Sequence, residues 1–142
     1  MKQPDHRAES VDAILRSHGV IPTAQRLQIG GMVLARPTHF SAEQLYEEVN
    51  ESGGRVSKAT VYNTLGLFVE KGLLRQVLVD PSKVFYDSNM APHYHFYDVE
   101  SGRLEDIDAS EIRIGALPEP TDGVQIEGVD VIVRIRRTPP QP

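Results

Sequence analysis

The stretch His93-Tyr94-His95-Phe96-Tyr97-Asp98-Val99, followed by Glu100-Ser101-Gly102 and Arg103-Leu104-Glu105-Asp106-Ile107, organises the C-terminal part of the chain. This pattern predicts a strand, a turn and a returning strand. Alternate side chains of an extended strand leave the same face, so His93 and His95 point the same way. A two-residue turn at 100–101 would place Asp106 directly opposite His95, on that same face.

These side chains favour a transition-metal site. Two imidazoles with one or two carboxylates, Asp106 and the upstream Asp87, suit iron(II), manganese(II) or zinc(II) better than calcium. Two other interpretations stay open at this point. The histidines can be ordinary strand residues with satisfied hydrogen bonds, and facial-triad enzymes carry the same H-x-H pattern.

Length and composition narrow the class of protein. The 142 residues fit one domain or two small ones, and no cysteine is present. The lack of thiols excludes disulfides and any structural four-cysteine zinc site. No apolar run approaches the ~18 residues of a membrane span, and the first residues lack the apolar stretch of a signal peptide. We therefore expect a cytoplasmic protein with no membrane partner.

The charge is unevenly distributed. The net charge is −5, but residues 1–87 hold ten Lys/Arg against ten Asp/Glu, whereas residues 88–142 hold five against ten. The acidic excess lies wholly in the C-terminal part. A neutral N-terminal part remains compatible with DNA binding, and the acidic part with cation binding.

The N-terminal part reads as a winged helix-turn-helix. Amphipathic patterns predict helices over about 7–17, from the Thr23 cap to before Pro37, from the Ser41 capping box to about 52, and over 58–71. A β-hairpin over 73–86, with its turn at 80–82, follows as a two-stranded ribbon. In this arrangement the fourth helix enters the DNA major groove with its N-terminal end first. The exposed residues expected to contact DNA there are Ser57, Lys58, Thr60, Tyr62 and Asn63.

The rest of the chain predicts a second, smaller domain. We expect a winged-helix DNA-binding domain over 1–87, a hinge over 88–92, and a dimerisation and metal-sensing domain over 93–142, in the α+β class. A helical turn at 108–111, an irregular connection at 117–120 and a strand over 129–136 complete the prediction. Two or three strands are marginal alone, so pairing with a second copy is expected. A homodimer would present two recognition helices to a palindromic operator.

Four motifs resemble the ferric uptake regulator (Fur) superfamily of metal-dependent repressors. They are Pro22-Thr23-Ala24-Gln25-Arg26, His39-Phe40-Ser41-Ala42-Glu43-Gln44-Leu45-Tyr46, Ser57-Lys58-Ala59-Thr60-Val61-Tyr62-Asn63-Thr64-Leu65 and His93-Tyr94-His95. The resemblance covers about residues 13–137. The ending, residues 117–120 and 129–137, is most similar to the iron response regulator (Irr) branch. The peroxide regulator (PerR) branch is second.

The resemblance implies a site and a mechanism. It implies a regulatory metal site made of His39, Asp87, His93, His95 and Asp106, and it adds Arg26 to the DNA-binding residues. Groups from both sides of the hinge would then set the angle between two recognition helices on an AT-rich palindrome. The two C-x-x-C pairs of most members are missing, and Asp98 and Ser101 stand where the first pair would be. The short haem-binding Cys-Pro motif of some Irr proteins is also missing, which leaves His93 and His95 as candidate haem ligands.

Together these observations predict a DNA-binding regulator of iron and haem homeostasis that is not an enzyme. It would respond to Fe(II) or Mn(II), with Zn(II) binding in vitro, or to haem. The alternative is a PerR-like peroxide-sensing repressor, which the aspartate at Asp106 resembles. A small non-haem metalloenzyme using His93, His95 and Asp106 as a facial triad is the alternative from another class.

Overall fold

The computed structural model describes residues 10–139, so the predicted first-helix residues before Ser10, and His6, lie outside the described part. The chain divides into two compact units, Met1–Met90 and Ala91–Pro142. The boundary falls inside the segment 88–92 expected as a hinge, and its role as a hinge remains a prediction. No helix among the described residues is long and apolar enough to cross a bilayer.

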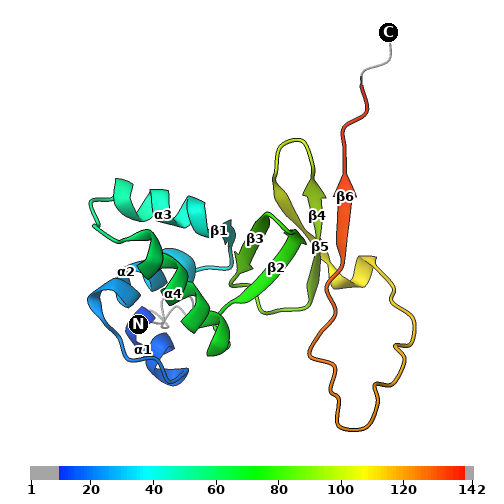
Figure 1. Cartoon of the computed structure of the whole chain (residues 1–142), viewed down its shortest axis with the longest axis horizontal. Coiled ribbons are helices and arrows are strands. Elements are labelled where there is room, and N and C mark those ends of the chain that lie inside the picture. Colours follow the sequence, from blue (N-terminus) through cyan, green and yellow to red (C-terminus); the bar gives the residue numbers. More distant parts are fainter. Residues whose placement is uncertain (1–9, 140–142) are drawn as a thin grey trace, which may run out of the picture. The chain divides into compact units, whose positions relative to one another are not determined.

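The N-terminal unit contains four helices and a small sheet (Figure 1). In chain order these are α1 (Val11–Ser17), α2 (Ala24–Val33), β1 (His39–Ser41), α3 (Ala42–Glu51), α4 (Lys58–Glu70), β2 (Arg75–Asp80) and β3 (Lys83–Asp87). Each helix begins at a serine or threonine cap, whose hydroxyl oxygen accepts a hydrogen bond from the backbone amide three residues later. The caps are Ser10, Thr23, Ser41 and Ser57. The predicted capping box of Ser41 and Gln44 is confirmed.

One apolar core holds this unit together. Leu15 of α1, Ile29 of α2, Leu45 of α3 and Phe68 of α4 are fully buried in it. Gly30 fits the same packing, because a Cβ there would lie 2.7 Å from Cγ1 of Val11. A glycine at position 30 therefore allows α2 to approach α1 closely. No such contact exists at Gly31, where a Cβ would meet nothing within 4 Å.

The wing differs from the prediction in one respect. It is a three-stranded sheet in the order β1-β3-β2, not a two-stranded ribbon, because His39–Ser41 pairs antiparallel with β3. A three-residue strand is too short to show a period in sequence, and it forms only because the β3 edge is available. The pairing brings the segment after α2 into register with the end of the hairpin.

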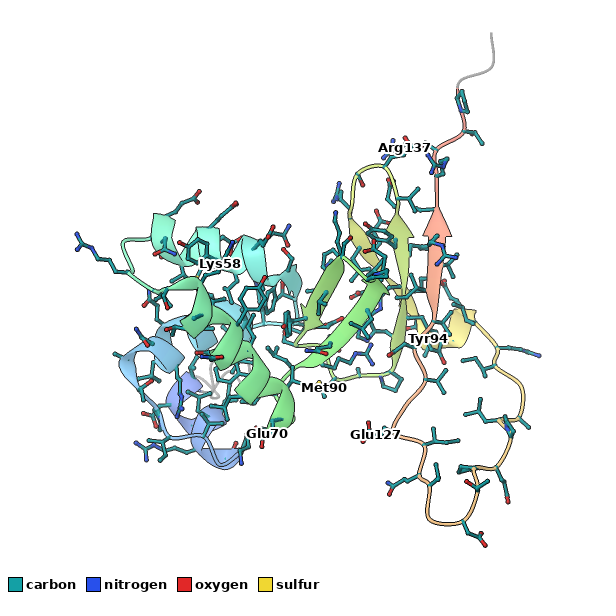
Figure 2. The ribbon with its side chains drawn as sticks, viewed as in Figure 1. Lys58, Glu70, Met90, Tyr94, Glu127 and Arg137 are labelled. Carbon is teal, nitrogen blue, oxygen red and sulfur yellow. The ribbon has the colours of Figure 1, made fainter. Side chains whose placement is uncertain are left out.

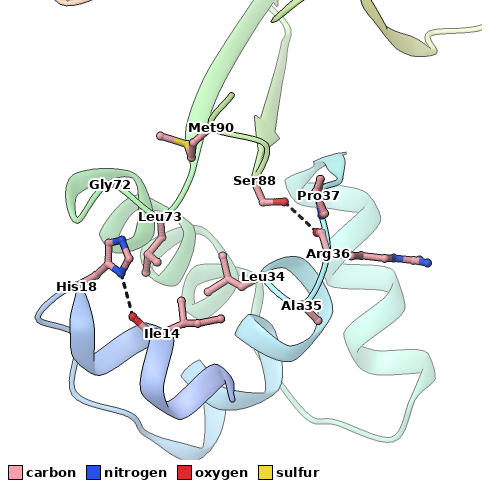
Figure 3. A pocket seen from close by; sticks show the side chains of 10 residues that line it. All are labelled: Ile14, His18, Leu34, Ala35, Arg36, Pro37, Gly72, Leu73, Ser88 and Met90. Carbon is pink, nitrogen blue, oxygen red and sulfur yellow. Dashed lines mark hydrogen bonds between the residues drawn. The ribbon is translucent and has the colours of Figure 1, made fainter. Parts of the chain in front are cut away.

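The N-terminal unit also contains a pocket of about 330 Å³ beside the start of the predicted hinge (Figure 3). Apolar side chains such as Ile14, Leu34 and Leu73 line it, together with Ser88 and Met90. His18 lies at its rim and contacts the Ile14 carbonyl oxygen through Nδ1 at 3.0 Å. This contact belongs to the end of α1, so His18 has a structural role here.

The C-terminal unit is a second three-stranded sheet in the order β5-β4-β6. Its elements are β4 (His93–Asp98), β5 (Leu104–Asp108), the 3-10 turn η2 (Ala109–Glu111) and β6 (Ile132–Ile135). The predicted register is confirmed, because His95 pairs directly with Asp106. The predicted turn of helix at 108–111 is also confirmed.

The last strand is shorter than expected. The predicted strand 129–136 is formed only over Ile132–Ile135, which pairs parallel to β4. The ladder with β4 starts at the pair His95 and Ile132 and ends at the pair Asp98 and Ile135, so residues 129–131 and Arg136 lie outside it. The face expected for Val129, Val131, Val133 and Ile135 is not buried within one chain, because Val129 and Ile135 are exposed.

Candidate metal centre and nucleic-acid interface

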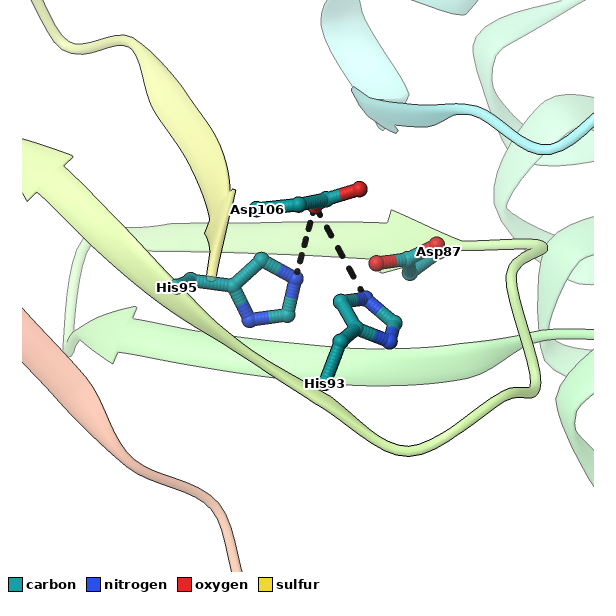
Figure 4. A group of neighbouring side chains, drawn as sticks. All are labelled: Asp87, His93, His95 and Asp106. Carbon is teal, nitrogen blue, oxygen red and sulfur yellow. Dashed lines mark ion pairs between the residues drawn. The ribbon is translucent and has the colours of Figure 1, made fainter. Parts of the chain in front are cut away.

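Three predicted ligands come together inside the C-terminal unit (Figure 4). Nε2 of His95 lies 3.5 Å and Nε2 of His93 lies 3.8 Å from Oδ1 of Asp106. The two imidazole rings meet edge to face, with centroids 4.6 Å apart. His93 and His95 are buried, whereas the Asp106 side chain is 47% exposed, so the cluster is open to solvent on the carboxylate side.

These distances are close to those of ligands that share one cation. Both exceed the ~2.7–3.2 Å of a good N–H···O hydrogen bond. Two ligand atoms that each lie ~2.1 Å from one ion are separated by roughly 3.0 Å in octahedral and 3.4 Å in tetrahedral geometry, so these side chains would close by a few tenths of an ångström around an ion. The donor set of imidazole nitrogen and carboxylate oxygen suits iron, manganese or zinc. The three side chains therefore meet the basic requirements of a metal-binding group.

The orientation of His93 is fixed by the backbone. Its Nδ1 lies 2.7 Å from the carbonyl oxygen of Ala91. A carbonyl can only accept a hydrogen bond, so the proton of a neutral ring belongs on Nδ1. The lone pair then lies on Nε2, the atom that faces Asp106. A partner of this kind is how proteins commonly set the tautomer and direction of a metal-binding histidine.

The other two predicted ligands lie in the N-terminal unit. Asp87 ends β3 and is 1% exposed; His39 begins β1 and is half-buried. The two residues are direct cross-strand partners, which places their side chains on one face of the sheet. The Asn89 amide donates to Oδ1 of Asp87 at 2.8 Å. Each unit thus assembles its own share of the predicted ligands.

Sequence reasoning missed Arg75. It is the cross-strand partner of Asp87 on β2, so in the sheet the carboxylate lies between His39 on one side and Arg75 on the other. A guanidinium beside Asp87 contributes to the charge balance of a buried acid. The turn predicted at 80–82 could have paired these two residues, because cross-strand partners around it sum to 162, as they do in the structure from Arg75 to Leu78.

The residues that replace the first cysteine pair have a structural role in this chain. Oδ1 of Asp98 accepts the amides of Glu100 and Ser101, at 2.9 and 3.2 Å, and closes the β4–β5 turn. These bonds, that from Ser101 first, lower the pKa of the Asp98 carboxyl below its ordinary value. The Asp98 carboxylate thus closes this turn through hydrogen bonds to the backbone.

The exposed face of α4 carries most of the predicted DNA contacts (Figure 2). The exposed residues among them are Ser57, Lys58, Tyr62 and Asn63. Thr60 is half-buried, and its hydroxyl oxygen accepts a hydrogen bond from the Ser57 hydroxyl at 2.9 Å. Thr60 therefore contributes mainly to the cap. The Lys58 ammonium lies 5.8 Å from the centroid of the Tyr46 ring, which ties the first turn of α4 to α3.

The N-terminus of α2 adds to this surface. Residues 23–26 and the α4 residues Thr60, Asn63, Thr64 and Leu67 line one hollow. Arg26 is half-buried beside it and donates to the Ile21 carbonyl oxygen at 2.8 Å. The hollow between α2 and α4 thus brings Arg26 of α2 and Asn63 of α4, two of the residues expected to contact DNA, to one surface.

Comparison with known proteins agrees with this architecture. The family described as "Ferric uptake regulator family" matches residues 17–133. The peroxide-responsive repressor PerR of Staphylococcus aureus is 30% identical over 102 residues, which are 72% of this chain and 69% of that protein. Two solved structures share the fold. They are the Pseudomonas aeruginosa ferric uptake regulator with manganese (TM-score 0.70, 23% identity, 92% of this chain, 100% of that one) and the Campylobacter jejuni peroxide stress regulator (TM-score 0.58, 20% identity, 91% and 94%).

Fold and site together define a metal-responsive, DNA-binding transcription regulator. The chain belongs to the ferric uptake regulator family. Members of this family are homodimers that bind DNA operators, and they are not enzymes. The metalloenzyme alternative is therefore wrong.

Proposed function

We propose that this protein is a metal-dependent regulator in which His39, Asp87, His93, His95 and Asp106 bind one iron(II) or manganese(II) ion. The convergence of His93, His95 and Asp106 in the C-terminal unit carries this proposal. The His39–Asp87 pair supplies two further ligand groups from the DNA-binding unit. As a regulator of transcription, the protein would act in the cytoplasm.

The short connection between the two sets of ligands supports a regulatory role. Asp87 ends β3 and His93 begins β4, so six residue steps, at most ~20 Å of extended chain, join them. If both units ligate the same ion, the segment 88–92 is held in one conformation. A ligand shifts a conformational equilibrium only through different affinity for the two states, and ligands drawn from both units provide that difference.

Metal-dependent operator binding tests this proposal. Fluorescence anisotropy with an AT-rich palindromic duplex should show affinity that changes at least about tenfold on addition of Mn²⁺. His93→Ala should abolish the change while the circular dichroism spectrum is retained. His18→Ala, at the end of α1, is the matched control and should respond like the wild type. An unchanged Mn²⁺ response in His93→Ala would refute the assignment.

Peroxide sensing is the better supported of the two candidate signals. Its supports are the similarity to the S. aureus peroxide-responsive repressor and the two aspartates among the proposed ligands. In this scheme hydrogen peroxide oxidises a ligand imidazole: one oxygen atom replaces a C–H hydrogen as C–OH, and water is the other product. Iron-loaded protein treated with peroxide should gain about 16 Da, the mass of one oxygen atom, on His39 or His93. Manganese-loaded protein treated in the same way should show no such gain.

The iron-response alternative is tested in the same assay. If haem at His93 and His95 is the signal, hemin should weaken operator binding, and His95→Ala should remove that effect. If hemin has no effect and peroxide causes the mass change, peroxide sensing is supported and haem sensing is rejected.

A further inference from the structure

Asp87 is the most deeply buried acidic residue of the described chain, with 1% of its surface exposed. Desolvation favours the neutral form of a carboxyl group, so a buried carboxylate needs compensating charge or hydrogen bonds to stay ionised. The Asn89 amide donates one hydrogen bond to Oδ1 of Asp87, but a backbone amide carries no net charge. The negative charge of Asp87 is therefore balanced by a side chain or by a bound ion.

A permanent cation lies next to Asp87 in the sheet. Arg75 begins β2 and is the direct cross-strand partner of Asp87 on β3, so both side chains leave the same face. Arg75 is half-buried, and its Nε atom lies below the molecular surface. A guanidinium stays protonated at every physiological pH. The sheet thus places a fixed positive charge beside the buried acid.

The hairpin contains a second cation that lies too far away for this role. Lys83 is exposed and begins β3, whereas Asp87 ends it. Four residue steps at about 3.3 Å each separate them by roughly 13 Å along the strand. Exposed charges at this distance are largely screened at physiological ionic strength, where the Debye length is about 8 Å. Of these two cations, Arg75 is the one whose charge acts on Asp87.

A bound divalent ion would compete with Arg75 for the same carboxylate. The proposed metal ligands include two carboxylates, Asp87 and Asp106, and the histidines are neutral when they ligate a metal. With the guanidinium beside them, the two carboxylates carry one net negative charge instead of two. A cation already beside Asp87 repels a second one. Arg75 therefore favours the metal-free protein.

We propose that Arg75 is the internal counter-ion of Asp87 and sets the metal concentration at which the regulator becomes loaded. This inference rests on the proposed metal site and names a positioning residue that tunes its affinity without binding the ion. In the metal-free protein the guanidinium neutralises the buried carboxylate. In the metal-bound protein the ion takes over that role, and Arg75 remains as a repelling charge. The regulator would then respond only when free metal is abundant.

Substitutions that remove or keep the charge at position 75 test this proposal. Titration of Mn²⁺ followed by electron paramagnetic resonance, at a salt concentration of about 0.15 M, should show that Arg75→Gln lowers the dissociation constant at least about threefold. Arg75→Lys keeps the charge and should stay within about twofold of the wild type. Lys83→Gln removes the same charge from the far end of β3 and is the matched control, with an expected change below about twofold.

Two results would overturn the proposal in this titration. The first is unchanged or weaker Mn²⁺ binding in Arg75→Gln, because a residue that only packs or orients Asp87 can lose affinity but not raise it. The second is an equal gain in Lys83→Gln, which would assign the effect to the overall charge of the hairpin.

Urea unfolding without metal gives a second, independent measurement. Arg75→Gln leaves Asp87 without its counter-ion, and adding Asp87→Asn removes the charge that was left behind. The double variant should therefore be destabilised less than the sum of the two single variants. An Arg75→Gln protein that folds only together with Asp87→Asn would be the extreme form of this coupling. Strictly additive effects would overturn the proposal.

The two measurements keep this inference separate from the proposed function. If the wild type binds no Mn²⁺, the proposed function fails, whatever the unfolding cycle shows. If the wild type binds Mn²⁺ and the cycle is additive, the metal site stands and the counter-ion role of Arg75 fails.

Discussion

His39 and Asp87 face each other across β1 and β3, although 48 positions separate them in the chain. The pairing links the segment before α3 to the last residue before the predicted hinge. A displacement of the Asp87 end of β3 would therefore reach the start of α3, and Tyr46 of that helix contacts Lys58 of α4.

Substitution of Asp87 should weaken metal binding. Asp87→Asn keeps the shape of the side chain but removes its negative charge, so the Mn²⁺ dissociation constant should rise about 10- to 100-fold. Titration of Mn²⁺ followed by electron paramagnetic resonance measures this. Asp80→Asn, at the tip of the same hairpin, is the matched control, because the Asp80 carboxylate is engaged by Ser82. Equal losses in both variants would contradict the assignment of Asp87.

The two ends of α4 should contribute differently to DNA binding. Lys58→Ala should weaken operator and nonspecific binding alike and lower the slope of log affinity against log salt by about 1. Lys71→Ala, just beyond the other end of the helix, should leave the slope unchanged. Asn63→Ala should cost about 1–3 kcal/mol for the operator and less for unrelated DNA, because its amide can read a base edge. Anisotropy over a salt series checks all three.

Asp98 should make the stability of the protein depend on pH. Amides of Ser101 and Glu100 hold the pKa of Asp98 below its ordinary value of 3.8, so the carboxylate stabilises the folded state above that pH. The stabilisation is lost as the pH falls through the lowered pKa of the folded state. Asp98→Asn should therefore unfold more easily than the wild type at pH 7, and the difference should shrink as the pH falls below 3.8.

Urea titrations at a series of pH values measure this difference in the free energy of unfolding. Asp130→Asn, in the exposed segment before β6, is the control. A gap between Asp98→Asn and the wild type that stays constant from pH 7 to pH 2.5 would show that lost turn geometry, not charge, is responsible.

The Ser88 hydroxyl should stabilise the start of the hinge segment. It accepts the Thr38 amide at 2.9 Å and lies 3.2 Å from the Arg36 carbonyl oxygen (Figure 3). Ser88→Ala leaves the Thr38 amide without this acceptor, which should cost about 1 kcal/mol and lower the melting temperature by about 2–4 °C. Thermal unfolding measures the change, and amide exchange should become faster at Thr38. Ser17→Ala, whose hydroxyl bonds only within the last turn of α1, should leave exchange at Thr38 unchanged.

Local signals in the sequence predicted much of this fold. The caps predicted at Thr23 and Ser41 mark helix starts through interactions within a few residues, and the structure has both of them. The pairing of His95 with Asp106 followed from one short turn. Such features need no knowledge of distant contacts.

Features that depend on distant pairing were not predictable in the same way. The strand His39–Ser41 exists because β3 offers an edge 46 positions later, and no period can appear in three residues. The end of the chain was predicted as a longer strand because its alternation is real, although a single chain supplies no surface that buries it.

The position of β4 in its sheet has a mechanical consequence. This strand is hydrogen-bonded on both sides, to β5 over residues 93–97 and to β6 over residues 95–98, so His95 belongs to two ladders at once. A strand clamped on both flanks resists sliding and bending, and cannot shift to suit the radius of an incoming ion. At the proposed metal site, adjustment to ion size would therefore depend on the half-exposed Asp106 side chain and on ligands from outside this sheet. Asp106 and the ligands from outside the sheet should consequently decide which metal radius is preferred, because the positions of the two imidazoles are fixed.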